Sequence, residues 1–141
     1  MHTSATVSGP EARPGVLRAC IVDDHTAVRQ WLARRLDTLG IEVCAVSETL
    51  VDGVRSILAH RPDLAVVDNR LPDGRGIDLC RAVSDSMPGV ELILHTGVMS
   101  PLEESQAFEA GVCRVALKSI QGDDLMTALR DFAARHPRAG T

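Results

Sequence analysis

Four short apolar runs of the sequence each end on a polar residue, and these polar residues differ in chemical kind. Two carboxylates, Asp23 and Asp24, follow the first run, and Asp68 ends the second. Thr96 ends the third run, and Lys118, the only lysine of the chain, follows the fourth. If the runs are parallel strands, their carboxyl ends meet at one edge of a sheet, where open α/β sheets bind ligands. Three carboxylates, a hydroxyl and an ammonium in one crevice predict a site that accepts a phosphoryl group.

The two adjacent carboxylates indicate a cation. Asp23 and Asp24 repel each other at a strand end, which is tolerable only if a positive charge neutralises them. Together with Asp68 they offer the hard oxygen ligands that Mg²⁺ prefers, with room for water and a phosphate oxygen. A helix N-cap, which Asp often forms, would explain one of these carboxylates but not two beside a third. The sequence therefore predicts a magnesium site.

Asp68 is the expected nucleophile, which would take the phosphoryl group as a mixed anhydride. Transfer of this kind depends mostly on positioning and on neutralising the equatorial oxygens. Mg²⁺ would hold one oxygen, the compact ammonium of Lys118 a second, and the Thr96 hydroxyl with nearby backbone N–H groups a third. Taken singly, Asp68 could open a turn and Lys118 could be a solvated strand end, so the prediction depends on the combination. We assign no metal or catalytic role to His25 and His95, because a hard-oxygen site has no use for imidazole.

Short apolar runs alternate with longer amphipathic ones from residue 17 onward. The expected strands are 18–23, 42–46, 64–68, 91–95 and 114–117, and the expected helices are 27–39, 50–60, 77–86, 101–110 and 122–134. Strict alternation implies a parallel sheet with right-handed crossovers and helices on both faces. Five strands fit the flavodoxin-like, doubly wound α/β fold with strand order 2-1-3-4-5. We expect a flexible leader at 1–16, one folded domain at 17–134 and a frayed tail at 135–141.

Composition limits the other classes of function. The chain has 141 residues, which is enough for one domain with its own core. One Trp, two Phe and no Tyr leave no stacking platform for single-stranded nucleic acid. A net charge of −4 with dispersed arginines gives no basic stripe for duplex DNA. We therefore expect no direct nucleic acid binding by this chain.

The cysteines and the apolar segments indicate a compartment. The four cysteines stand far apart, without the spacing of a zinc site. Cys20, Cys44 and Cys113 are expected as small core residues in a reducing environment. The sequence has neither the apolar segment of a signal peptide nor a run long enough to span a bilayer. These features predict a cytoplasmic protein without a membrane partner.

Four motifs at the ends of the expected strands occur in a fixed order. They are Val22-Asp23-Asp24-His25, Asp68-Asn69-Arg70-Leu71-Pro72-Asp73-Gly74, His95-Thr96-Gly97 and Leu117-Lys118. Together they resemble the CheY-like receiver domain of two-component response regulators, most closely the NarL/LuxR-type subgroup. The resemblance covers about residues 17–134.

The resemblance implies a phosphoacceptor that takes a phosphoryl group from a histidine kinase or phosphotransfer protein onto Asp68. Its surface would then change for a downstream output, transcriptional output included. The domain would not be an enzyme, apart from its own autophosphorylation and autodephosphorylation. By resemblance, the backbone carbonyl of Arg70 completes the Mg²⁺ shell, and Gly97 joins Thr96 and Lys118 in binding and sensing phosphate.

Three departures from the family pattern concern switching. Val115 stands where receivers usually carry an aromatic residue that swings inward, Ser119 replaces the usual proline after the lysine, and Gly97 replaces a common alanine. We therefore expect signalling through the Thr96 loop and the helix at 101–110, without an aromatic swing. The expected output face comprises the last two helices and the fifth strand around Val115, with a homodimer as one outcome.

Two other classes of function remain as alternatives. A Mg²⁺-dependent phosphomonoesterase of the haloacid dehalogenase type carries a second Asp two residues after its nucleophile. Here Asp23 is followed by His25 and Asp68 by Arg70. A flavodoxin-like FMN binder would need a Gly-rich phosphate loop after the first strand, where this chain has carboxylates. Two forms of the native protein are compatible with the sequence, a stand-alone receiver and the receiver of a longer transcription factor.

Overall fold

Strands and helices alternate along the chain in the computed structural model, which describes residues 15–136. The strands are β1 (Leu17–Val22), β2 (Ile41–Ser47), β3 (Leu64–Asp68), β4 (Arg70–Leu71), β5 (Gly74–Arg75), β6 (Glu91–Thr96) and β7 (Arg114–Leu117). The helices are α1 (Thr26–Thr38), α2 (Leu50–His60), α3 (Gly76–Ser86), α4 (Pro101–Glu109) and α5 (Asp123–Arg135). Most of the expected leader (1–16) and tail (135–141) lies outside the described residues.

Five strands form one parallel sheet in the order β2-β1-β3-β6-β7. Because β6 and β7 are the fourth and fifth of the expected strands, the predicted order 2-1-3-4-5 and the doubly wound α/β fold are confirmed. Asp68 of β3 is in register with His95 of β6, and Thr96 of β6 is in register with Leu117 of β7. The ends of β3, β6 and β7 therefore lie along one edge of the sheet, as the site requires.

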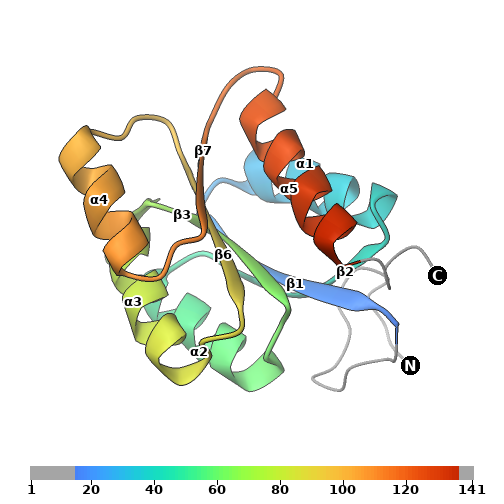
Figure 1. Cartoon of the computed structure of the whole chain (residues 1–141), viewed down its shortest axis with the longest axis horizontal. Coiled ribbons are helices and arrows are strands. Elements are labelled where there is room, and N and C mark those ends of the chain that lie inside the picture. Colours follow the sequence, from blue (N-terminus) through green and yellow to red (C-terminus); the bar gives the residue numbers. More distant parts are fainter. Residues whose placement is uncertain (1–14, 137–141) are drawn as a thin grey trace.

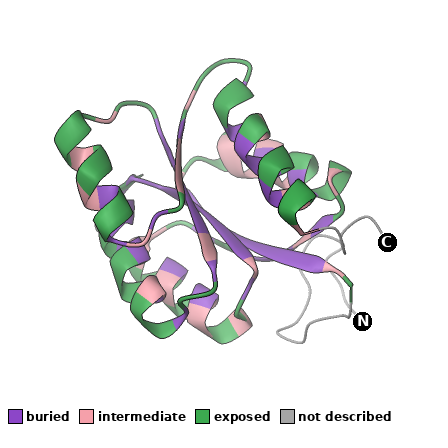
Figure 2. Ribbon diagram, in the orientation of Figure 1, coloured by how far each residue is buried: buried purple, intermediate pink, exposed green. Residues whose placement is uncertain are grey.

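Two apolar clusters lie on opposite faces of the sheet, because successive strand residues point to opposite sides. In β1, Leu17, Ala19 and Ile21 pack with residues of α1 and α5, whereas Cys20 and Val22 pack with residues of α2, α3 and α4. Figure 1 shows α1 and α5 on one side of the sheet and the other three helices on the opposite side. The three inner strands, β1, β3 and β6, are almost wholly buried (Figure 2). Both layers of helices thus fix the sheet edge that carries the polar residues.

Local signals set the ends of two helices. α4 begins with a capping box, in which Ser100 Oγ accepts the Glu103 N–H at 3.1 Å and the Glu103 carboxylate accepts the Ser100 N–H at 3.0 Å. α2 ends at His60, because the C-cap residue Arg61 has a left-handed φ of 48° and Pro62 prevents further helix. These signals are readable in the sequence, and the observed bounds of these two helices lie within one residue of the expected ones.

The structure differs from the sequence prediction in the loop after β3 and at one cysteine. β4 and β5 pair antiparallel within that loop, and strands of two residues are too short to leave a periodic apolar pattern. Cys20 and Cys44 are buried, but Cys113 is exposed, so its expected place in the core is wrong. It lies between α4 and β7, where the neighbouring Val112 takes the buried position. None of the helices within residues 15–136 has the length and apolar character needed to span a bilayer.

Candidate metal centre at the carboxyl edge of the sheet

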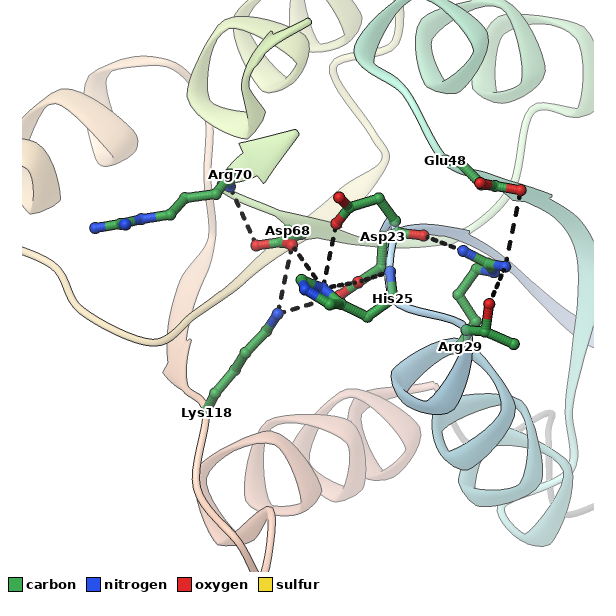
Figure 3. A network of polar contacts seen from close by, with 9 residues as sticks. Asp23, His25, Arg29, Glu48, Asp68, Arg70 and Lys118 are labelled. Carbon is green, nitrogen blue, oxygen red and sulfur yellow. Dashed lines mark hydrogen bonds and ion pairs between the residues drawn. The ribbon is translucent and has the colours of Figure 1, made fainter. Parts of the chain in front are cut away.

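Four of the predicted site residues converge at the carboxyl edge of the sheet. Asp23 directly follows β1 and Asp68 ends β3, and each of these residues is 3% exposed. Lys118 follows β7, and its Nζ lies 3.4 Å from Asp23 Oδ2 and 3.4 Å from Asp68 Oδ2. Figure 3 shows the lysine reaching across the edge to both carboxylates. Asp24 completes the group, with its side chain one third exposed. The structure thus brings these four residues together, while their roles in metal and phosphoryl binding stay predictions.

His25 joins the same group, although no role was predicted for it. Its Nδ1 lies 3.1 Å from Asp23 Oδ1, 3.2 Å from Asp24 Oδ1 and 3.8 Å from Asp68 Oδ2. His25 and the three carboxylates each offer a ligand atom, and these four atoms lie within 4.8 Å of one another. The signal that could have found His25 is its position directly after the carboxylate pair, at the turn into α1.

Burial of Asp68 determines its electrostatics. Desolvation raises the pKa of its carboxyl group, and the Asp23 charge adds to this rise. The Arg70 N–H, which donates to Asp68 Oδ1 at 3.1 Å, and the charge of Lys118 act in the opposite direction. Asp68 Oδ2 is buried yet accepts no hydrogen bond, and the same holds for Asp24 Oδ1. Among the described residues, Lys118 is the one ammonium beside three carboxylates, so the cluster keeps an excess of negative charge. A divalent cation would balance this charge, and the hard carboxylate oxygens fit Mg²⁺.

The loop after β3 is held close to the cluster by its own backbone. The Gly76 N–H donates to the Asn69 carbonyl at 2.9 Å, and Asn69 Oδ1 accepts the Ile77 N–H at 3.2 Å. A Cβ added at Gly76 would overlap the carbonyl oxygen of Asp68, so only glycine lets α3 begin this close to β3. The glycine thus fixes the distance between the helix and the phosphoacceptor candidate.

The far side of this loop is attached to α2. Asp73 Oδ1 accepts the Leu50 N–H at 2.7 Å, and Oδ2 accepts the Val51 N–H at 3.1 Å. A carboxylate at the first N–H groups of a helix satisfies orphan donors and complements the helix dipole. These hydrogen bonds lower the pKa of Asp73, whose side chain is otherwise exposed.

Arg29 is a positioning residue that the sequence did not reveal. It lies in α1, and its Nη1 donates to the Asp23 carbonyl at 2.8 Å. Its Nη2 donates to Thr26 Oγ1 at 3.2 Å and lies 3.8 Å from Glu48 Oε2 (Figure 3). The guanidinium therefore fastens the turn after β1 to α1. An arginine on an amphipathic helix gives no sequence signal for such a contact.

Of the four other predicted residues, Arg70 alone has a described contact to the carboxylates, through its backbone N–H. Thr96 is fully buried, and its hydroxyl donates to the Val98 carbonyl at 3.3 Å. Gly97 is exposed, and a Cβ there would meet no atom within 4 Å. Arg70 contributes its N–H to Asp68, while its side chain extends away from the cluster (Figure 3). Val115 is partly buried and packs against the cluster beneath α2, α3 and α4. The predicted metal-binding role of the Arg70 carbonyl and the phosphate-sensing roles of Thr96 and Gly97 stay predictions.

A cavity of about 210 Å³ opens beside Lys118, between α1 and the segment after β7. Trp31, His95 and Ile120 are among its lining residues. Burial, followed by the charge of Lys118, lowers the pKa of His95 to about 4, so its ring is neutral at pH 7. None of the described peptide bonds is cis, so the bond from Lys118 to Ser119 is trans.

Comparisons with the sequences of known proteins identify a matching family and several relatives. The sequence profile of the response regulator receiver domain family matches residues 19–130. The chain is 34% identical to the DNA-binding transcriptional activator DevR/DosR of Mycobacterium tuberculosis, over 84% of this chain and 55% of that protein. It is 31% identical to the acid tolerance regulatory protein ActR of Rhizobium meliloti, over 77% of this chain and 56% of that protein. The chain thus spans about half the length of these curated relatives.

Solved structures show the same likeness. A CheY-like response regulator receiver domain protein from Methanospirillum hungatei JF-1 superposes with a TM-score of 0.78 at 27% identity, over 87% of this chain and 98% of that one. A two-component response regulator of the LuxR family from Aurantimonas sp. SI85-9A1 superposes with a TM-score of 0.73 at 26% identity, over 86% of this chain and 87% of that one.

Proposed function

The chain belongs to the response regulator receiver domain family of two-component systems, and on this premise we propose that Asp68 is its phosphoacceptor. The observation that carries the proposal is a buried Asp68 carboxylate with one oxygen free of hydrogen bonds, 3.4 Å from the ammonium of the only lysine. The receiver unit would span residues 17–134, which the family match to 19–130 supports.

The side chains at the carboxyl edge of the sheet would carry out the phosphoryl transfer. A carboxylate oxygen of Asp68 forms a bond to the phosphorus of a phosphohistidine on a histidine kinase or phosphotransfer protein. The P–N bond breaks, and its electron pair leaves with the imidazole of the donor. Lys118 neutralises charge on Asp68 and on an oxygen of the bound phosphoryl group. The Thr96 hydroxyl, now bonded to the Val98 carbonyl, would turn toward the phosphoryl group.

Asp23, Asp24 and Asp68 would hold Mg²⁺, together with the backbone carbonyl of Arg70. The ion would supply the positive charge that lets a trianionic cluster accept a further anion. Arg29 supports this arrangement from the outside, because it holds the carbonyl of Asp23 at 2.8 Å. The proposed role is that of a phosphoacceptor rather than an enzyme with a separate substrate. The phosphomonoesterase alternative lacks support, because the position two residues after Asp68 is Arg70 and not a second Asp.

The second part of the proposal is that the surface of α4, β7 and α5 transmits the signal by binding a partner. Large apolar side chains are exposed on and beside these elements: Val98, Leu102, Phe108, Leu117 and Ile120. Val115 is too short to relay a phosphate signal by a rotamer change, so the Thr96–Ser100 loop and α4 would move instead. Association through this surface, including a homodimer, would follow. Free cysteines, three of them buried, fit a cytoplasmic location, and the net charge of −4 supports the proposal that this chain does not bind nucleic acid directly.

The test of the phosphoacceptor is chemical labelling. Incubation with Mg²⁺ and a small acyl phosphate should add one phosphoryl group, seen by intact mass, and hydroxylamine should remove it. Asp68→Asn should abolish labelling, and chelation of the metal should do the same. The matched control is Asp78→Asn, an exposed carboxylate on α3 outside the cluster. Equal labelling of Asp68→Asn and the wild type would refute the assignment.

A further inference from the structure

The imidazole of His25 occupies a place in the carboxylate cluster that packing does not impose. Its side chain is 62% exposed, so burial does not drive the ring into the group. The backbone N–H of His25 donates to Asp23 Oδ1 at 2.9 Å, and Nδ1 approaches the same oxygen at 3.1 Å. Figure 3 shows the ring beside the carboxylates of Asp23 and Asp68. The ring is therefore held there by polar contacts.

The distances from Nδ1 match those between neighbouring ligands of one metal ion. Two adjacent ligands of an octahedral cation with bonds of about 2.1 Å lie about 3.0 Å apart, and opposite ligands lie about 4.2 Å apart. His25 Nδ1 is 3.1 Å from Asp23 Oδ1 and 3.2 Å from Asp24 Oδ1, which are adjacent-ligand distances. Its distance to Asp68 Oδ2, 3.8 Å, lies between the two values.

A second observation points independently to a cation at this place. Asp68 is 97% buried by side-chain area, since only 3% is exposed, and its Oδ2 accepts no hydrogen bond. The one ammonium nearby within residues 15–136, Lys118 Nζ, lies 3.4 Å from this oxygen and 3.4 Å from Asp23 Oδ2, so it is shared between two carboxylates. Three carboxylates beside one ammonium keep an excess of negative charge, which is costly at a buried site unless a further cation balances it. Asp68 Oδ2 lies 3.8 Å from His25 Nδ1, and Asp68 and His25 belong to the same group of possible ligands.

We propose that His25 is a metal ligand, and that it gives this receiver a preference for first-row transition cations such as Mn²⁺ and Co²⁺ over Mg²⁺. Three carboxylates alone form a hard site, suited to Mg²⁺ and Mn²⁺. An imidazole nitrogen adds affinity for Mn²⁺, Co²⁺ and Ni²⁺ in rising order, and also for Zn²⁺, whereas Mg²⁺ gains little from it. The inference rests on the proposed function, because it uses the same carboxylates.

A hydrogen-bonded His25 is the competing explanation. In that case Nδ1 carries a proton that it donates to the carboxylates, and a bound cation repels the ring. The two explanations differ in the metal-loaded protein. A ligand keeps Nδ1 at the cluster and loses its proton there, whereas a hydrogen-bond donor leaves.

The experiment compares metal affinities by calorimetry in the wild-type chain, His25→Ala and His25→Phe. The matched control is His60→Ala, because His60 lies in α2 and its Nδ1 is bonded to the Ser56 carbonyl. We expect the His25 variants to bind Co²⁺ at least about tenfold more weakly than the wild type, with Mg²⁺ affinity changed less than about threefold. Thermal unfolding checks that each variant is folded.

A spectroscopic readout accompanies the titrations. On adding diamagnetic Zn²⁺, the Nδ1 resonance of His25 in ¹⁵N-labelled protein should shift to that of a coordinated imidazole nitrogen. Unchanged Co²⁺ affinity in both His25 variants, or an equal loss of Co²⁺ and Mg²⁺ affinity, would overturn the inference. Failure of the proposed function would appear elsewhere, as absent Mg²⁺-dependent labelling of wild-type Asp68, whatever the metal preference.

Discussion

Gly76 controls how closely α3 approaches the phosphoacceptor candidate. A Cβ at this position would overlap the Asp68 carbonyl oxygen and would lie 2.9 Å from Val67 Cγ1 and 3.0 Å from the Asp68 carbonyl carbon. Normal contacts between carbon atoms begin at about 3.5 Å, so backbone at the end of β3 must shift to make room. Gly76→Ala therefore strains the strand end itself rather than a flexible side chain.

The expected cost follows from two opposing effects. Overpacking of a buried site costs about 3 kcal/mol when backbone must move. The loss of chain entropy in the unfolded state offsets about 1 kcal/mol of this cost. The free energy of unfolding should thus fall by about 2 kcal/mol, which lowers the Tm by roughly 6 °C in a domain of this size.

The assay is thermal and urea unfolding followed by far-UV circular dichroism, together with labelling of Asp68 by an acyl phosphate. The matched control is Gly89→Ala, because a Cβ at Gly89 meets no atom within 4 Å and the residue has no left-handed φ. Gly76→Ala should be less stable and label more slowly, whereas Gly89→Ala should behave as the wild type. Equal unfolding temperatures for the two variants would refute the reasoning about the close approach.

The remaining predictions concern one buried imidazole and the thiols. The pKa of His95 is about 4 in the folded chain and near 6.5 in the unfolded chain, so only the unfolded chain takes up a proton between these values. The contribution of the neutral ring to the free energy of unfolding is therefore fully present above pH 6.5 and is lost toward pH 4. In urea unfolding of the metal-free protein, the free energy of unfolding should fall by up to about 3 kcal/mol from pH 6.5 to pH 4. His95→Leu should flatten this dependence on pH, and an unchanged dependence would contradict the low pKa of His95. A thiol reagent should modify Cys113 quickly in the native chain and all four cysteines in denaturant, since burial protects the others and raises the pKa of Cys80 to about 12. Rapid native labelling that survives Cys113→Ser would argue against this burial.

The fold was predictable because its signals are local and repeated. Each long strand is an apolar run, and strict alternation with helices allows few topologies. The bounds of β3 and β7 agree with the expected ones because polar or turn-forming residues flank both runs. The short β4–β5 pair was missed because it depends on how the loop folds back after Asp68, which no periodicity encodes.

The candidate site was predictable where strand ends alone place a side chain. Asp23, Asp68 and Lys118 converge because they stand at the ends of parallel strands. Arg29 and His25 were not foreseen, because their contacts depend on side-chain direction and on the charge around them. A strand end fixes a backbone position, whereas an exposed side chain selects its conformation from local electrostatics.

The carboxylate of Asp73 restrains the chain on one side of Asp68 more than on the other. Its two hydrogen bonds to the first N–H groups of α2 tether the loop after β3 to a helix that is itself packed on the sheet. On the other side of Asp68, the turn after β6 begins at exposed Gly97, which has free space around its Cα. A displacement of Asp68 toward α2 is therefore resisted more strongly than a displacement toward α4. A movement that starts at Asp68 is thus directed toward the turn after β6 and α4.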